Sequence, residues 1–199
     1  MELLQTVKTL CGISAVSGRE HGAAAQIEAL FAPLCDSVRT DAFGNVYGTC
    51  RGEGANPRTV LLTAHYDEIG LIVTGIEKTG FLRFAAMGGI DAKTLPAQEV
   101  TVFGRETLYG VIGAKPPHLV TAEEMEKVQP LDELRIDIGF DGEEAARRVR
   151  IGDVAGFRFP LVELKNNRVA CRSLDNRAGV ATLLEVLREL KGLRHDDHV

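Results

Sequence analysis

Several features that would point to particular classes of protein are scarce in this sequence. Its 23 lysines and arginines are outnumbered by 28 acidic residues, giving a formal charge of −5, so it has no basic stripe for phosphate backbones. It lacks an apolar run long enough to cross a bilayer. The first residues, MELLQTVKTL, lack the continuous apolar segment of a signal peptide. We therefore expect neither a nucleic acid nor a membrane partner.

Cysteine is also sparse, and its spacing excludes two kinds of site. The chain has 4 cysteines, far apart and without a CxxC pair: Cys11, Cys35, Cys50 and Cys171. This spacing favours reduced thiols over a disulfide framework or a zinc knuckle. It predicts a cytoplasmic protein.

What the chain does contain is typical of a globular protein with a sizeable core. It has 199 residues, of which 45% are hydrophobic and 26% charged. Helical spacing of apolar residues predicts helices near residues 3–10, 20–34 and 176–190. Ser17 and Glu20 have the spacing of a capping box before the second of these. The stretch 37–52 predicts a hairpin around the turn 42–45.

The middle of the chain has a different residue pattern, in which short β segments are separated by glycines. Candidate strands are 71–76, 81–85, 100–103, 109–112 and 134–138, and the stretch DGEEAARRVR predicts one exposed helix. This pattern predicts a small β-rich domain, 69–164, inserted into an α/β domain formed by residues 1–68 and 165–199.

The stretch LLTAHYDEIGLIV, Leu61 to Val73, predicts a buried strand whose apolar residues run into two polar side chains, His65 and Asp67. Side chains alternate along a strand, so His65 and Asp67 project from the same face. Imidazole is a preferred zinc ligand, and a nearby carboxylate can bind the metal or orient the ring. The pattern alone favours a structural histidine beside a solvated aspartate over a metal site, because such pairs often arise by chance.

A second candidate, Asp175, stands in a strand-to-helix turn before the stripe of helix 176–190. The carboxyl ends of strands are where α/β sheets bind ligands, although Asp175 could instead be the N-cap of that helix. The terminal residues His195, Asp196, Asp197 and His198 also group potential ligands, but no predicted element fixes their geometry, and we assign them no site. Residues 197–199 could equally start a strand.

Two motifs together, AHYDEIGLIV (64–73) and SLDNRAG (173–179), resemble the M42 family of metal-dependent aminopeptidases, whose members are labelled glutamyl aminopeptidases, deblocking aminopeptidases or endoglucanases. Further matches occur in family order along the whole chain: GISAVSGRE (12–20), DAFGN (41–45), MGGID (87–91), GVIGAKPPHL (110–119), IDIG (136–139) and IGD (151–153).

The resemblance implies a peptidase-type α/β sandwich domain interrupted by an inserted small β-barrel domain used in assembly. It implies two divalent metal ions, with zinc, cobalt or manganese suited to nitrogen and oxygen ligands. In this family pattern His65 binds one metal, Asp67 orients His65, and Asp175 bridges both metals. The activity implied is hydrolysis of N-terminal residues from peptide substrates by a metal-bound water, in a homo-oligomer that is commonly a dodecamer.

The sequence also departs from the family pattern. A Glu-Glu pair that supplies the general base and a metal ligand, a further acidic ligand and a distant histidine have no counterpart here. Glu123-Glu124 and Glu143-Glu144 fall in the inserted segment, and the second pair has Arg147 and Arg148 at the spacing of surface ion pairs.

We therefore expect an incomplete portion of such an enzyme, with the C-terminal part of its α/β domain missing and with negligible activity alone. The alternative is a non-catalytic, truncated homologue acting as an assembly or peptide-binding module. Carbohydrate hydrolysis would need two opposed carboxylates, which nothing in the sequence arranges.

Overall fold

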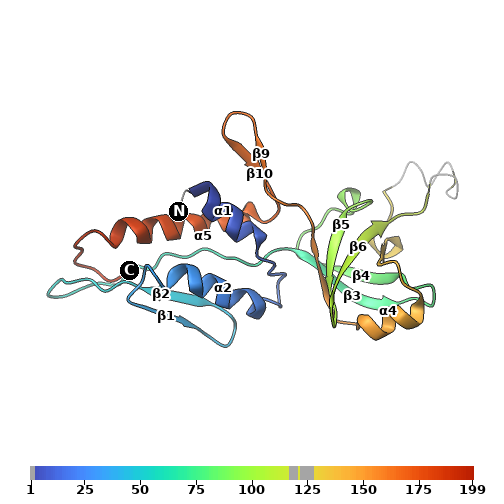
Figure 1. Ribbon diagram of the computed structural model, residues 1–199, viewed down its shortest axis with the longest axis horizontal. Helices are drawn as coiled ribbons and strands as arrows, with labels where there is room; N and C mark the ends of the chain where they lie inside the picture. The colour runs from blue at the N-terminus through green and yellow to red at the C-terminus, as the bar shows by residue number, and fades with distance from the viewer. Residues whose placement is uncertain (1–2, 117–120, 122–127) are drawn as a thin grey trace. The chain divides into compact units, whose positions relative to one another are not determined.

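A computed structural model describes residues 3–116, 121 and 128–199, and these form two compact units (Figure 1). Met1–Glu68 and Pro160–Val199 make up the first, which we call the helical unit. Ile69–Phe159 make up the second, the barrel unit. The chain thus re-enters the helical unit at Pro160, whereas the sequence placed that boundary after Leu164.

Among its described residues, the helical unit contains three helices and two hairpins. The helices are α1 (Leu3–Gly12), α2 (His21–Phe31) and α5 (Leu174–Leu190), and α1 packs beside α5 (Figure 1). The hairpins pair β1 (Ser37–Thr40) with β2 (Val46–Thr49), and β9 (Val162–Leu164) with β10 (Arg168–Ala170). The predicted apolar stripes of α2 and α5 bury the residues that form much of this core: Ile27, Phe31, Val180, Leu184 and Leu187.

The predicted capping box before α2 is wrong. The N-cap of α2 is Glu20, which makes no side-chain capping bond. The hydroxyl of Ser17 instead donates to the Oδ2 of Asp67 at 2.5 Å. A hydrogen bond to an ionised acceptor is stronger than a neutral one, so the distant carboxylate outcompetes the local helix terminus.

The prediction of a strand over residues 61–67 is also wrong for the part of the chain that is described. Isolated bridges flank this segment, pairing Thr59 with His198 and Glu68 with Val16, but residues 61–67 belong to no sheet. Strands are stabilised by their cross-strand neighbours, and no described strand lies alongside these residues. The alternation of side chains persists nonetheless, because Ala64 and Tyr66 pack against the core of the helical unit.

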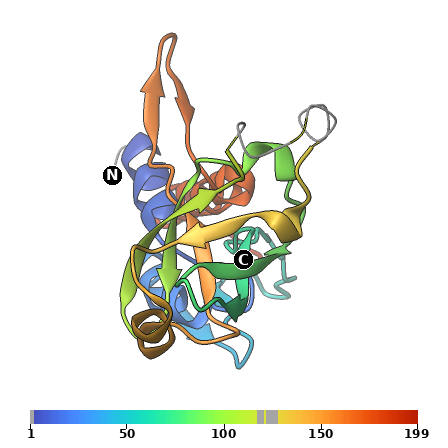
Figure 2. The same ribbon diagram turned by 90° about the vertical axis from the view of Figure 1, so that its right-hand side faces the viewer.

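The barrel unit is a closed antiparallel barrel with the strand order β3-β4-β7-β6-β5-β8 (Figure 2). Its strands are β3 (Gly70–Ile76), β4 (Leu82–Met87), β5 (Glu99–Phe103), β6 (Thr107–Gly113), β7 (Arg135–Asp137) and β8 (Val154–Phe157). Alternate side chains fill the interior, including Leu71 and Val73 from β3 and Val100 and Val102 from β5. The prediction of a β-rich segment is confirmed, and the chain is a mixed α/β protein containing a closed barrel.

Short helical elements complete the barrel unit. The 3-10 turns are Ala92–Thr94 and Leu131–Glu133, and the predicted exposed helix is α4 (Gly142–Arg148). Asp141 caps α4 by accepting a hydrogen bond from the backbone N–H of Glu144. The expected ion pairs are present, since Arg147 contacts Glu143 and Glu144, and Arg148 contacts Glu144. Within the described residues, no helix has the length and apolarity needed to cross a bilayer.

All four cysteines are free, and two have strongly raised thiol pKa values. Burial, followed by a hydrogen bond with Cys171, raises the pKa of Cys11 to about 12. Because only the thiolate is a nucleophile, we expect iodoacetamide at pH 8 to alkylate Cys11 at least about tenfold more slowly in the folded chain than in guanidinium. Peptide mass spectrometry of timed samples measures both rates. Equal rates would contradict the burial of this thiol.

Candidate metal centre

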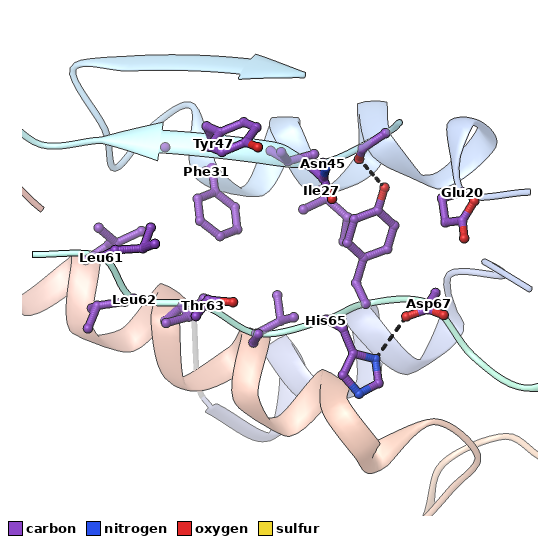
Figure 3. A pocket seen from close by; sticks show the side chains of 18 of the residues that line it. Glu20, Ile27, Phe31, Asn45, Tyr47, Leu61, Leu62, Thr63, His65 and Asp67 are labelled. Atoms are coloured by element: carbon purple, nitrogen blue, oxygen red, sulfur yellow. Dashed lines mark hydrogen bonds and ion pairs between the residues drawn. The ribbon is translucent and has the colours of Figure 1, made fainter. Parts of the chain in front are cut away.

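The extended backbone of residues 65–67 brings two polar side chains together at the surface of the helical unit. The Nδ1 of His65 lies 3.0 Å from the Oδ1 of Asp67 (Figure 3). The other carboxylate oxygen of Asp67 accepts the hydrogen bond from Ser17 described above. Asp67 therefore holds the imidazole through Nδ1, which leaves Nε2 available to a second partner. Ser17 had no ligand pattern in the sequence, and only its distance from Asp67 in the fold reveals its part in this arrangement.

Asp175 approaches His65 from the start of α5. Its Oδ1 lies 3.1 Å from the Nε2 of His65. Asp175 and Asn176 have non-helical backbone angles, so Asp175 stands in the turn and regular helix begins after it. The side chain of Asn176 caps this helix by accepting the N–H of Gly179 at 3.1 Å. Asp175 is thus not the N-cap, and its carboxylate, with the side chain 95% exposed, is free to bind a ligand beside His65.

Beneath these residues, a buried carboxylate joins the three segments that carry them. Glu68 is 6% exposed. One oxygen accepts the backbone N–H of Ala15 at 3.0 Å and the hydroxyl of Ser14 at 3.3 Å. The other accepts hydrogen bonds from Arg172 and Ser173, immediately before the turn with Asp175. Glu68 therefore ties together the loop 14–17, the segment 65–68 and the turn 172–175.

Arg177 supports the same turn from below. It is fully buried, and its guanidinium donates to the backbone carbonyls of Leu10 and Ile13 at the end of α1. Desolvation lowers its pKa, while the charge of Glu68 acts in the opposite direction. The start of α5 is therefore fixed both to the end of α1 and to Glu68.

The donor set fits a divalent cation in part. Two ligands held about 2.0–2.1 Å from one zinc ion lie roughly 3 Å apart, close to the separation of His65 Nε2 and Asp175 Oδ1. The hydrogen bond from Nδ1 to a carboxylate is the usual support of a metal-binding histidine. However, no group of three or more His, Cys, Asp or Glu side chains suited to a metal ion occurs among the described residues.

The other acidic and histidine candidates lie elsewhere. Glu123 and Glu124 fall outside the described residues, and Glu143 and Glu144 are in the ion pairs of α4. Asp197 pairs with Arg58, and the Nδ1 of His198 accepts the backbone N–H of Gly52 at 3.0 Å. The terminal residues thus serve local structure. Of the two alternatives for residues 197–199, the bridge from His198 to Thr59 supports the start of a strand.

Comparisons with known proteins connect this chain to an enzyme family. The model of the M42 glutamyl aminopeptidase family matches residues 44–199. A putative aminopeptidase from Acetivibrio thermocellus is 35% identical over 191 residues, which cover 96% of this chain and 54% of that protein. The chain therefore spans about half the length of such relatives.

Solved structures of related peptidases also match the whole of this chain and cover it with about half of their own length. An aminopeptidase from the archaeon Desulfurococcus kamchatkensis superimposes with a TM-score of 0.90 at 36% identity, covering 100% of this chain and 54% of that one. The TET1 peptidase of Pyrococcus horikoshii superimposes with a TM-score of 0.87 at 36% identity, covering 100% of this chain and 59% of that one. That peptidase can assemble into a tetrahedron or a large octahedral shell.

Proposed function

This chain belongs to the M42 glutamyl aminopeptidase family, and from this membership we propose that it provides part of the active centre of a metal-dependent aminopeptidase that removes N-terminal residues from peptides. The observation that carries the proposal is the line of contacts from Asp67 through both ring nitrogens of His65 to Asp175. It places one nitrogen and one carboxylate donor side by side and holds the ring by its opposite edge.

Each residue has a distinct part in the proposed centre. His65 and Asp175 would bind metal, with Asp175 able to bridge two ions because a carboxylate has two oxygens. Asp67 would fix the tautomer and orientation of His65 without binding metal itself. When bound, the two ions would supply Lewis-acid polarisation of the peptide carbonyl and activation of a water molecule. Zinc, cobalt and manganese all suit this nitrogen and oxygen donor set.

The proposal also covers the fold, the assembly and the cellular location of the protein. We propose that the helical unit is part of a peptidase-type α/β sandwich and that the barrel unit serves assembly into a homo-oligomer. Support for assembly comes from the solved relatives, one of which is a dodecamer. Four free cysteines suit a reducing cytoplasm.

The alternative function is a non-catalytic module for assembly or peptide binding. Within the described residues no group of three or more potential metal ligands occurs, and the other carboxylate beside His65, that of Asp67, is engaged by the imidazole and by Ser17. General-base catalysis contributes about 10²–10⁴-fold to such reactions. We therefore expect these 199 residues alone to have negligible peptidase activity.

Metal binding tests the centre directly. In titrations with Co²⁺ followed by visible absorption, we expect His65→Ala and Asp175→Asn each to weaken binding by at least tenfold. Asp67→Asn should weaken it by about 10–100-fold, because it removes the support of the histidine. The control is His21→Ala, since the ring of His21 lies 3.2 Å from the carbonyl of Ala42 and, among the described residues, makes no hydrogen bond to His65, Asp67 or Asp175; this variant should leave binding unchanged.

Two results would count against the proposal. Binding of Co²⁺ that is insensitive to His65→Ala and Asp175→Asn would place the metal elsewhere. Efficient, metal-dependent hydrolysis of an aminoacyl p-nitroanilide by the chain would instead contradict the expected inactivity and show that a base is present.

A further inference from the structure

The fold brings the four cysteines together in two pairs, although they are far apart in the sequence. Cys11, in the last turn of α1, contacts Cys171, which directly follows β10. Cys35 contacts Cys50, which directly follows β2. A hydrogen bond joins the two thiols in each pair. Thiols that lie side by side can be oxidised to a disulfide, so each pair is a candidate site of redox modification.

Contacts on both sides of the first pair hold its two segments together. The guanidinium of Arg177 donates to the backbone carbonyls at positions 10 and 13, which flank Cys11. Glu68 accepts hydrogen bonds from the backbone N–H at position 15 and from Arg172, the chain neighbour of Cys171. Helices α1 and α5 also pack together. The two sulfurs are therefore kept close by the fold itself.

The two thiols of this pair differ in burial and in hydrogen bonding. Cys11 is 4% exposed, whereas Cys171 is only partly buried. Burial and then the hydrogen bond with Cys171 raise the pKa of Cys11. A hydrogen bond raises the pKa of the thiol that donates it, so the S–H of Cys11 donates to the sulfur of Cys171. Cys171 thus keeps its own proton free to leave, and its sulfur is the one that an oxidant reaches first.

Positive charge lies beside the same pair. The charges of Arg177 and Arg172 act to lower the pKa of Cys11, against the larger effect of its burial. Arg177 is fully buried and the side chain of Arg172 is 17% exposed, so solvent and salt screen these charges only weakly. Positive charge favours the thiolate, which is the form that reacts with oxidants. The pair thus combines an accessible sulfur, a neighbouring thiol and local positive charge.

The second pair has the opposite arrangement. Burial, the charge of Cys50 and a hydrogen bond with Cys50, in that order, raise the pKa of Cys35 to about 12, so the less buried thiol is the donor. The acceptor Cys50 is 6% exposed, and its own thiol donates to the carbonyl of Leu34 at 3.5 Å. The charge of Asp36 raises the pKa of Cys35 further. This pair is therefore a matched control within the same unit.

We propose that Cys171 and Cys11 form a peroxide-sensitive thiol pair, in which Cys171 is oxidised first and Cys11 closes the disulfide. The thiolate of Cys171 attacks one oxygen of hydrogen peroxide, which gives a sulfenic acid and expels hydroxide. This hydroxide takes up the proton that Cys171 released. The sulfur of Cys11 then attacks the sulfenic sulfur, and the proton of Cys11 leaves with the sulfenic hydroxyl as water. The two sulfurs lose two electrons in total, and the peroxide gains them.

The disulfide would join the end of α1 to the segment that leads into Asp175. In a reducing compartment such a bond is transient, and thiol reductants restore the pair. Peroxide would be the only co-reactant, and neither step uses a metal ion. The inference therefore does not depend on the proposed metal centre.

Timed oxidation of the 199-residue chain gives the main test. The reduced chain is mixed with stoichiometric hydrogen peroxide at neutral pH, samples are blocked with N-ethylmaleimide in guanidinium, and their peptides are mapped by mass spectrometry without reduction. We expect the Cys11–Cys171 disulfide to form at least about tenfold faster than the Cys35–Cys50 disulfide, because only the first pair offers an accessible sulfur beside positive charge. Dithiothreitol should restore both thiols.

Two serine variants test the order of the steps. In Cys11→Ser the sulfenic acid of Cys171 has no thiol to react with, so dimedone should label Cys171. In Cys171→Ser, dimedone should leave Cys11 unlabelled, because that thiol is buried and protonated. Cys35→Ser is the control and should leave the formation of the Cys11–Cys171 disulfide unchanged. Thermal unfolding by circular dichroism checks that each variant is folded.

Four outcomes would overturn the proposal. Equal rates for the two disulfides would mean that the surroundings of the first pair give it no advantage. Sulfinic acid at Cys171 without a disulfide would mean that Cys11 does not reach it. Labelling of Cys11 in Cys171→Ser would reverse the order of the steps. Disulfide-linked dimers as the first product would make a second copy of the chain, and not Cys11, the partner of Cys171.

Discussion

Replacing Glu68 by alanine is expected to lower the free energy of unfolding of the helical unit by about 3–5 kcal/mol. The side chain of Glu68 is 4% exposed, and it is the acceptor for Arg172. Removing it leaves the positive charge of Arg172, itself only 17% exposed, without its partner. The N–H of Ala15 also loses its acceptor in a buried position, which adds a desolvation cost.

Urea unfolding followed by far-ultraviolet circular dichroism measures this effect, since α1, α2 and α5 all belong to the helical unit. The matched control is Glu53→Ala in the same unit. Glu53 is 65% exposed and pairs with Arg194, which is 79% exposed, so its loss should cost less than about 1 kcal/mol. Equal losses for the two variants would mean that Glu68 does not hold the three segments together.

Local periodicity explains what the sequence could predict about the candidate site. Side chains two residues apart on an extended chain share a face, and His65 and Asp67 do meet. The placement of Asp175 in a turn before a helix was likewise readable, because the apolar stripe of α5 fixes where that helix runs. The metal-binding roles themselves remain proposals.

The parts that sequence patterns missed depend on contacts between distant segments. Nothing near Glu68 in the sequence indicates Arg172 or Ala15, which meet it only after the chain has folded. The same reason explains the error at Ser17, where a distant carboxylate replaced a local cap. The strand expected at 61–67 needs neighbours on both sides, and an apolar β-branched run cannot by itself supply them.

The barrel unit illustrates a third limit. Alternating apolar residues and glycine-marked turns indicated most of its strands, but closure depends on which strand pairs with which. The pairing of β3 with β8 joins residues far apart in the sequence, through Leu71 with Ala155 and Ile72 with Val154. No periodicity encodes such a pairing, which is decided by the packing of all six strands around one interior.

Substitution of one turn glycine should show how tightly this closure is held. Gly80 lies between β3 and β4 with φ +96°, and a Cβ added there would lie 1.7 Å from the carbonyl oxygen of Phe140. Gly80→Ala must therefore adopt a strained backbone and also displace the chain before α4. We expect it to destabilise the barrel unit by about 2–5 kcal/mol.

Gly139→Ala separates these two causes. Gly139 has φ +76°, but an added Cβ would have no neighbour within 4 Å, so this variant carries the backbone strain without the collision. Its cost should be about 1–2 kcal/mol. Hydrogen exchange of the amides in β3 and β4 under native conditions reports the opening free energy in each variant. If Gly80→Ala cost no more than Gly139→Ala, the turn would be able to move away from Phe140. The contact between this turn and the chain after β7 would then not limit the stability of the barrel.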